Sequence, residues 1–261
     1  MQHSKLITYL LLAILTFASQ AFAAPPFITD DAEPADYRQL QIYPYASTIS
    51  QTHSTMVYMP SFEFDYGIIP HTEFHIIFTM ATYLPEQGGN PALLKRATGI
   101  DDTEVNFKTR LLSETKYRPG IAIAPTLELP TGNSKRLLGN GRLWTKLPIW
   151  IQKNMGTWVT YGGGGYVFNS APGMKNYLYG GWLLQKNFTE HFSFGGEIFS
   201  QGTAATHRDP PFQDEGSVTL LNLGAIYNVN NNNNFSISLG HSIIGTPQWV
   251  GYAGFYHSIQ T

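Results

Sequence analysis

The chain has 261 residues, of which 13% are charged and 14% aromatic, with no cysteine and a formal net charge of -2 at pH 7. Without cysteine, neither a disulfide framework nor a thiolate metal site can form, and the slight negative charge predicts no attraction to nucleic acid. The many Gly, Tyr and Phe residues (25, 15 and 16) are typical of β-strands with aromatic belts rather than of amphipathic helices.

The N-terminus has the pattern of a secretory signal. Lys5 precedes an apolar run over residues 6–17, and Ala21-Phe22-Ala23 forms an A-x-A cleavage site. The run is shorter than the roughly 20 residues of a spanning helix, and no later stretch supplies one. We therefore expect a cleaved signal peptide over residues 1–23 and a mature chain that is exported, either soluble or inserted as a β-barrel.

The lead-in, residues 24–38 (APPFITDDAEPADYR), is Pro-rich and acidic and lacks any strand pattern. It is expected to be a periplasmic segment that precedes the barrel. Its acidic side chains, and those of Asp101 and Asp102, are interpreted as solvated loop charge rather than as a divalent cation site.

Residues 39–261 predict an antiparallel transmembrane β-barrel of about twelve strands, an all-β fold. Runs of about ten residues alternate between apolar and polar positions and are separated by turn residues. The expected strands are residues 40–49, 55–66, 72–83, 103–112, 120–129, 143–153, 157–168, 176–186, 191–200, 217–229, 234–243 and 250–260.

Connection lengths give a second regularity. Short turns are expected at one rim and longer loops at the other, as in outer-membrane barrels, and an even strand number places both termini at the short-turn, periplasmic rim. The long connections are residues 84–102, 130–142, 169–175 and 202–216, and residues 50–54 depart from the rule by being short.

The faces of the strands can be assigned from charge. On residues 103–112, Val105 and Phe107 alternate with charged and amide side chains, and a Lys or Arg facing lipid at the bilayer midplane costs roughly 2 to 4 kcal/mol. The polar set is therefore expected to face the lumen, although a soluble β-sandwich would show the same alternation. The candidate lumen-lining residues are Glu73, His75, Glu104, Asn106, Lys108, Arg110, Glu128 and Glu197.

Other constellations carry little chemistry. His71, Glu73 and His75 share one strand face, but the two histidines would be about 13 Å apart, too far for one metal. His241 and Ser242 are adjacent and point to opposite faces, so they cannot act as base and nucleophile. The glycine run 162–165 lacks the residues that complete a phosphate-binding loop and is expected to bend the wall or leave lumen space.

Several motifs resemble one family. PPFITDDAEP near the mature start, LELPTGN at residues 127–133, LGNG at 138–141, WLLQKNFTEHFSFGGEIF at 182–199 and LLNLGAIYNV at 220–229 resemble the outer-membrane family labelled the meta-pathway of phenol degradation. The resemblance implies an outer-membrane barrel of transporter type and supplies no catalytic residues. The chain departs from many barrels in lacking a terminal aromatic residue.

Together these observations predict an outer-membrane channel or transporter for passive uptake of small molecules, aromatic or otherwise hydrophobic ones included. No enzyme activity, cofactor or metal is expected; the expected partners are outer-membrane lipid, lipopolysaccharide, the barrel-assembly machinery and a small solute. Because Glu104, Lys108 and Arg110 share one face, ion selectivity is expected to be weak. The alternatives are a structural or surface-interaction barrel plugged by the lead-in or by Trp144 and Trp150, and an outer-membrane hydrolase.

Overall fold

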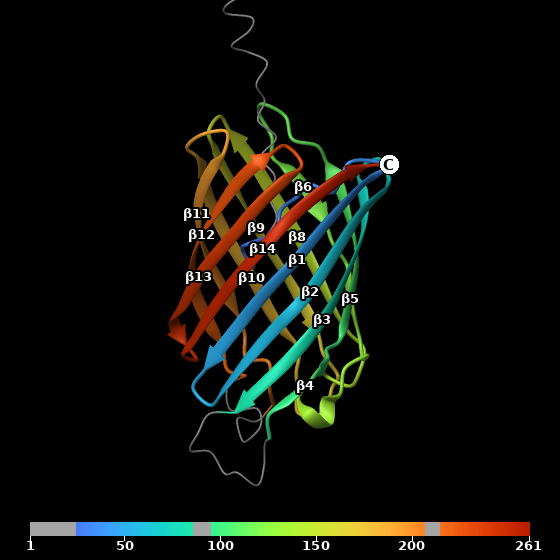
Figure 1. Cartoon of the computed structure of the whole chain (residues 1–261), viewed down its shortest axis with the longest axis vertical. Coiled ribbons are helices and arrows are strands. Elements are labelled where there is room, and N and C mark those ends of the chain that lie inside the picture. The colour runs from blue at the N-terminus through green and yellow to red at the C-terminus, as the bar shows by residue number, and fades with distance from the viewer. Residues whose placement is uncertain (1–24, 86–94, 207–214) are drawn as a thin grey trace, which may run out of the picture.

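The computed structural model describes residues 25–85, 95–206 and 215–261, so the expected signal peptide, residues 1–23, lies outside the described residues. Long tilted strands form a barrel wall around a central lumen (Figure 1). The elements are β1 (Gln39–Gln51), β2 (Ser54–Ile69), β3 (Thr72–Pro85), β4 (Ala97–Ile100), β5 (Thr103–Leu112), β6 (Gly120–Ile123), β7 (Thr126–Leu129), the 3-10 helix η1 (Ser134–Arg136), β8 (Trp144–Met155), β9 (Trp158–Phe168), β10 (Tyr177–Asn187), β11 (Phe192–Gln201), β12 (Val218–Asn230), β13 (Asn233–Gly245) and β14 (Gln248–Gln260).

The predicted barrel of about twelve strands is confirmed. The fourteen strands occupy twelve positions around the barrel, and we call each position a stave. β4 and β5 both pair with β3 and form one stave. β6 and β7, which lie between β5 and β8, form another. Every pairing is antiparallel, and β1 pairs with β14 from Gln39↔Gln260 to Gln51↔Gln248. This last pairing closes the sheet and leaves it without edges.

Two staves consist of two strands each, where the sequence predicted a single strand. The expected strand 120–129 is split at Ala124-Pro125, because proline has no N–H to donate to the ladder. Residues 97–100, expected to lie in a loop, form β4 and extend the stave of β5 beyond Asp101-Asp102. Within the described residues, no helix has the length and apolarity needed to cross a membrane.

Apolar side chains point outward and polar ones inward, as the alternation predicted. On β11, Phe194 and Ile198 are exposed on the outer face, whereas Glu197 between them is 1% exposed. Phe199 also points inward, two residues after Glu197, so it is an apolar exception on the otherwise polar inner face of β11. It packs against Val218 and other apolar side chains. The outward face is a wide apolar band that needs a nonpolar solvent to cover it.

The two rims differ. The C-terminus and the start of β1 lie at the short-turn rim, where the Thr261 N–H donates to the Arg38 carbonyl at 2.8 Å (Figure 1). The long connections gather at the opposite rim, but two connections there, residues 52–53 and 246–247, span only the gaps from β1 to β2 and from β13 to β14. On the side of β1 and β14, the wall at the long-loop rim is therefore connected by short turns.

Candidate functional site: the barrel lumen

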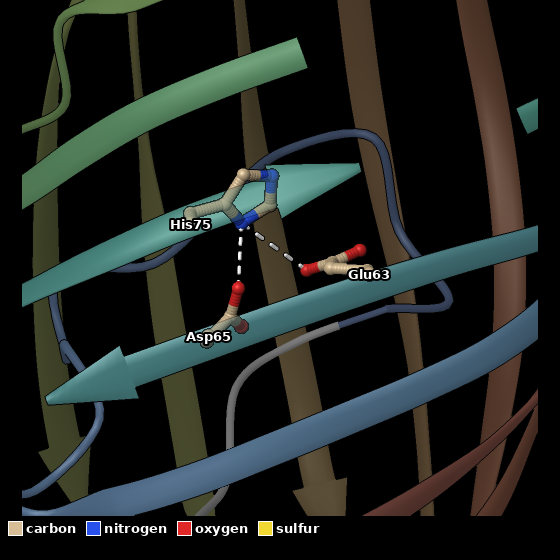
Figure 2. A group of neighbouring side chains, drawn as sticks. All are labelled: Glu63, Asp65 and His75. Atoms are coloured by element: carbon tan, nitrogen blue, oxygen red, sulfur yellow. Dashed lines mark ion pairs between the residues drawn. The ribbon is translucent and has the colours of Figure 1, made fainter. Parts of the chain in front are cut away.

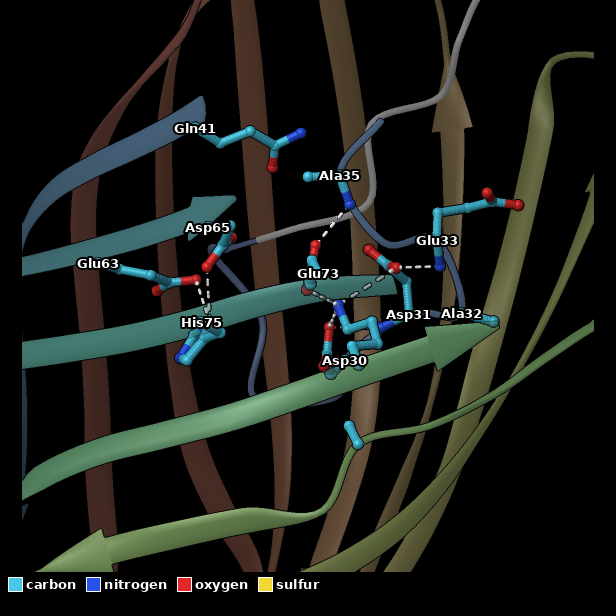
Figure 3. Close-up of polar contacts among 12 residues, drawn as sticks. Asp30, Asp31, Ala32, Glu33, Ala35, Gln41, Glu63, Asp65, Glu73 and His75 are labelled. Atoms are coloured by element: carbon cyan, nitrogen blue, oxygen red, sulfur yellow. Dashed lines mark hydrogen bonds and ion pairs between the residues drawn. The ribbon is translucent and has the colours of Figure 1, made fainter. Parts of the chain in front are cut away.

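Residues 25–35 of the lead-in lie inside the lumen, where wall side chains bind their backbone (Figure 3), and residues 36–38 are exposed at the short-turn rim. The N–H groups of Ile28 and Thr29 both donate to the Glu197 carboxylate on β11, each at 2.8 Å. The Ala35 N–H donates to the Glu73 carboxylate on β3, at 2.5 Å. A buried segment without regular structure must find such acceptors for its N–H groups.

Further contacts come from other parts of the wall. The Ala32 N–H donates to Oε1 of Gln152 on β8, at 3.3 Å, and the Ser238 hydroxyl on β13 donates to the Pro26 carbonyl at 2.6 Å. Because β3, β8, β11 and β13 are spread around the barrel, the lead-in crosses the lumen instead of following one side.

Lys108 on β5 anchors the charged side chains of the lead-in. Its Nζ lies 2.9 Å from Asp30 and 3.7 Å from Asp31 of the lead-in, and 3.4 Å from Glu73 of the neighbouring strand. Two residues further along β5, Arg110 pairs with Glu33 of the lead-in. Two basic side chains on one strand therefore bind an acidic segment that begins far from them in sequence.

Asp31 is the most enclosed acid of the lead-in, and its side chain is fully buried. Its carboxylate accepts a hydrogen bond from the Glu33 N–H at 2.6 Å. Burial raises the pKa of the Asp31 carboxyl well above its ordinary value of 3.8, and the nearby Lys108 ammonium opposes this in part. Burial likewise raises the pKa of Glu33, against the effect of Arg110. The docked lead-in therefore holds protons more tightly than a free segment would.

His75 on β3 lies among three carboxylates. Its Nδ1 is 2.7 Å from Asp65 and 3.5 Å from Glu63, both on β2 (Figure 2), and its Nε2 is 3.5 Å from Glu104 on β5. Lys146 on β8 lies on the far side of Glu104, at 2.7 Å. A continuous polar chain therefore links β2, β3, β5 and β8 across the lumen face of the wall.

Seven of the eight residues predicted to line the lumen take part in the contacts described here, and Asn106 is buried on β5. Glu73, Lys108 and Arg110 bind the lead-in or each other, Glu197 binds the lead-in and accepts from Asn222 at 2.8 Å, and Glu128 pairs with Lys146 at 2.8 Å. These side chains form two groups: those that bind the lead-in (Glu73, Lys108, Arg110, Glu197) and those that do not (His75, Glu104, Asn106, Glu128).

The sequence analysis missed Glu63, Asp65 and Lys146, which complete these groups. A signal was present, since Glu63 and Asp65 are two residues apart on a predicted strand and so share a face. The same count places Lys146 on the lumen face of its strand, because Trp150 at four residues' distance is also inward.

Two cavities occupy the lumen on the side of the long loops. The first, of about 320 Å³, is lined by aromatic side chains including Trp150, Tyr179 and Phe199, and by Ile28 and Asp30 of the lead-in. The second, of about 540 Å³, lies among the loops; its lining residues include Tyr58, Tyr83, Asp101, Trp144 and Met174. Trp144 lines both cavities.

The other residue groups considered in the sequence have structural contacts. His71 contacts Arg110 at 2.7 Å, so His71, Glu73 and His75 have three separate sets of partners. The His241 ring packs on Trp249, while the Ser242 hydroxyl accepts from the Gln248 N–H. The glycine run 162–165 lies within β9, and a Cβ at Gly163 would be 2.0 Å from the Ile149 carbonyl oxygen. That run permits close approach of the neighbouring backbone.

The lumen carries an excess of negative charge. Its permanent cations, Lys108, Arg110 and Lys146, are in contact with six carboxylates or near them, and Glu63 and Asp65 contact His75. The nine carboxylates are Asp30, Asp31, Glu33, Glu63, Asp65, Glu73, Glu104, Glu128 and Glu197. The sequence analysis weighed four of the wall carboxylates and expected a more balanced field.

The sequence profile of the family described as "Putative MetA-pathway of phenol degradation" matches residues 76–258, more than half of the chain. The chain belongs to this family. The resemblance seen in the sequence motifs is thereby confirmed. Among curated proteins, none matches the chain in sequence.

Solved structures share the fold of this member of the phenol-degradation family. An outer membrane channel from Pseudomonas putida F1 superposes with a TM-score of 0.72 at 11% identity, over 91% of this chain and 100% of that chain. The KdgM porin in complex with oligogalacturonate has a TM-score of 0.57 at 10% identity, over 84% and 99% of the two chains. The NanC porin has a TM-score of 0.53 at 7% identity, over 83% and 98%. At such identities the likeness shows the barrel fold.

Two motifs of this phenol-degradation family member fold around one carboxylate. In residues 127–133 and 138–141, the N–H groups of Gly132 and Asn140 donate to Asp102 at 3.0 and 2.7 Å. Gly139 has φ +88°, and a Cβ there would be 2.2 Å from the Asp102 carboxylate. The glycines let the loop approach Asp102 closely, which fixes the loop at the mouth of the larger cavity.

Proposed function

We propose that this chain is an outer-membrane channel for passive passage of small molecules, with aromatic and other hydrophobic solutes favoured. The observation that carries the proposal is the aromatic cavity inside a closed barrel whose outer face is apolar. Eight-stranded barrels are filled by side chains and sixteen-stranded ones leave an aqueous channel, so twelve strands suit a narrow path. The similar P. putida F1 protein is itself an outer membrane channel.

The cavity suits a planar apolar solute. The Tyr179 ring lies 6.3 Å from the ring of Trp150 on one side and 6.3 Å from that of Phe199 on the other, in edge-on and tilted arrangements. These rings leave faces on which another ring can stack. Glu104 and Lys146, which also line this cavity, can orient a hydroxyl group on the solute.

Passage must involve the lead-in. Ile28 and Asp30 line the aromatic cavity on the side of the short-turn rim, so a solute that reaches the cavity from the loops meets the lead-in next. We propose that the lead-in narrows the path and shifts for each passage. The excess of carboxylates should favour cations among charged solutes, in contrast to the weak selectivity expected from β5 alone.

A second candidate function, a plugged structural barrel, is supported by the same lead-in contacts. Its backbone and charged groups bind wall residues on widely separated strands. In that case no solute would pass through the lumen, and the aromatic cavity would be a space left by side-chain packing.

Single-channel recording and solute flux into liposomes containing the full mature chain distinguish the two. We expect small conductance, a preference for cations and faster flux of phenol-sized aromatic solutes than of equally small polar ones. Phe199→Ser should reduce that preference, while Phe194→Ser, on the outer face of the same strand, should leave it unchanged. No conductance and no flux with the native chain, together with conductance once the lead-in is replaced, would support the plugged barrel.

A further inference from the structure

Apart from any passage, the structure places three metal-binding side chain types together on β2 and β3 (Figure 2). One ligand atom each from Glu63, Asp65 and His75 lies within 4.8 Å of the other two. The strand register sets this arrangement, since Asp65 is directly opposite His75 and Glu63 shares its inward face. Asp65 and His75 are 5% and 8% exposed, so the group is held by the wall.

The distances are close to those within a metal centre. Bonds of about 2.0 to 2.2 Å from Zn²⁺ to nitrogen and oxygen place neighbouring tetrahedral ligand atoms about 3.4 Å apart. Nδ1 of His75 is 3.5 Å from Glu63, and its 2.7 Å separation from Asp65 would need to open by a small side-chain rotation. Three protein ligands would leave a fourth position for water.

The other ring nitrogen of His75 already has the environment of a metal ligand. Its Nε2 is 3.5 Å from Glu104, which Lys146 holds at 2.7 Å. A histidine that binds a metal through one nitrogen usually donates its other N–H to a carboxylate or carbonyl, which fixes the tautomer and the ring orientation. Glu104 is placed to accept that N–H.

Two buried atoms of the group have close charged neighbours but no hydrogen bond of regular geometry among the described residues. They are Oδ1 of Asp65, 2.7 Å from Nδ1 of His75, and Nε2 of His75, 3.5 Å from Glu104. Buried polar atoms of this kind usually have a partner, so their state calls for an explanation. A cation among Nδ1 of His75, Glu63 and Asp65 would give Oδ1 a ligand bond and free Nε2–H to donate to Glu104.

We propose that Glu63, Asp65 and His75 bind one divalent transition-metal ion, with Glu104 as the carboxylate that orients His75. Imidazole with two carboxylates suits Zn²⁺ and its first-row neighbours, whereas Ca²⁺ and Mg²⁺ prefer all-oxygen sites. A divalent cation would also balance the two carboxylate charges. The ion can arrive through the lumen, because Glu104 lines the aromatic cavity.

Calorimetric titration of the refolded full mature chain in detergent with Zn²⁺ tests the proposal, together with the visible absorption of bound Co²⁺. We expect one ion per chain and a Co²⁺ spectrum of a site without sulfur. His75→Gln and Asp65→Asn should each abolish the stoichiometric site and the spectrum. Glu104→Gln should retain the site and weaken it about 10- to 100-fold, as loss of an orienting carboxylate does.

His191→Gln is the matched control, because His191 lies at the short-turn rim, where its Nδ1 contacts the Asn228 carbonyl. It should bind Zn²⁺ as the native chain does. Heat-modifiable gel migration establishes that each variant is folded. If the native chain takes up no Zn²⁺, or if folded His75→Gln and Asp65→Asn bind it unchanged, the proposal is overturned and the group is an imidazolium paired with two carboxylates.

Discussion

The two ends of the lumen are built by the same staves and yet differ in content. Toward the short-turn rim, Lys108 and Arg110 of β5 and the carboxylates of β3 and β11 hold the lead-in, and the lumen is filled. Toward the long loops, the continuation of these staves surrounds two cavities lined by aromatic side chains. The filled end depends on charge and hydrogen bonding, and the hollow end on aromatic walls.

The difference teaches what is needed to fill a barrel of this width. A peptide inside the lumen brings its own N–H groups, each of which needs an acceptor. The filled end supplies them through Glu73, Gln152 and Glu197. At the aromatic end, Trp150, Tyr179 and Phe199 line the cavity beside a few polar groups such as Glu104, so it is suited to a solute that combines an apolar ring with a polar group.

The largest effect on conductance should come from emptying the filled end of the lumen. Replacing residues 25–37 by a Gly/Ser sequence of equal length eliminates the docked groups and should raise single-channel conductance several-fold. Bilayer recordings measure it. A lead-in kept intact except for Ile28→Val is the control and should conduct like the native chain; equal conductance in all three would mean that the lead-in does not obstruct the path.

The second prediction compares a charge placed on the outward face of β5 with the same charge placed on its inward face. Phe107 is 45% exposed on the outer face, while Asn106 is buried beside the aromatic cavity. Phe107→Arg should weaken insertion by about 2 to 4 kcal/mol, whereas Asn106→Arg should insert normally. Folding titrations in lipid vesicles measure both; a greater loss for Asn106→Arg would contradict the assigned register.

Docking can be weakened without removing the lead-in. Glu197→Gln loses the charge on the acceptor of two backbone N–H groups and should destabilise docking by about 1 to 3 kcal/mol. Protease cleavage within residues 25–38 should become faster. Glu114→Gln breaks the pair with Lys153 away from the lead-in and should leave the cleavage rate unchanged. Equal rates in both variants would show that Glu197 does not hold the segment.

The smallest effect should be a dependence of docking on pH. Burial raises the pKa of Asp31 above its ordinary 3.8, against Lys108 and with Asp30 and Glu73 acting in the same direction as burial. The docked state therefore binds the proton more tightly. This contribution to docking is complete below about pH 4 and is lost as pH rises through the raised pKa. The lead-in should become easier to cleave as pH rises.

Asp31→Asn keeps the side-chain volume and cannot titrate, so it should flatten this pH profile. Glu33 remains and contributes in the same direction, because burial raises its pKa too. A profile of native steepness in Asp31→Asn would assign the titration to other groups.

The wall could be predicted from the sequence because its signal is local. Alternation assigned the buried and exposed faces of β5 and β11. The docked lead-in could not be predicted, because its partners are contacts between residues distant in sequence, such as Asp30 with Lys108. A segment without periodicity gives no indication of where it binds.

The group around His75 could be predicted from the sequence only in part. Glu63 and Asp65 share a face by spacing alone, but only the register of β2 against β3 places Asp65 opposite His75. The interruption at Pro125 was readable in principle, since proline cannot donate to the ladder, yet the apolar alternation on either side concealed it.

The seam between β1 and β14 also imposes an order of assembly. It joins the first and last strands, so it has the greatest sequence separation of any pairing and cannot form until the whole chain has been made. The acceptors for the lead-in on β3, β8 and β11 face one another as a set only when that seam is shut. Protection of residues 25–38 from protease during biogenesis should therefore mark the moment at which the wall is complete.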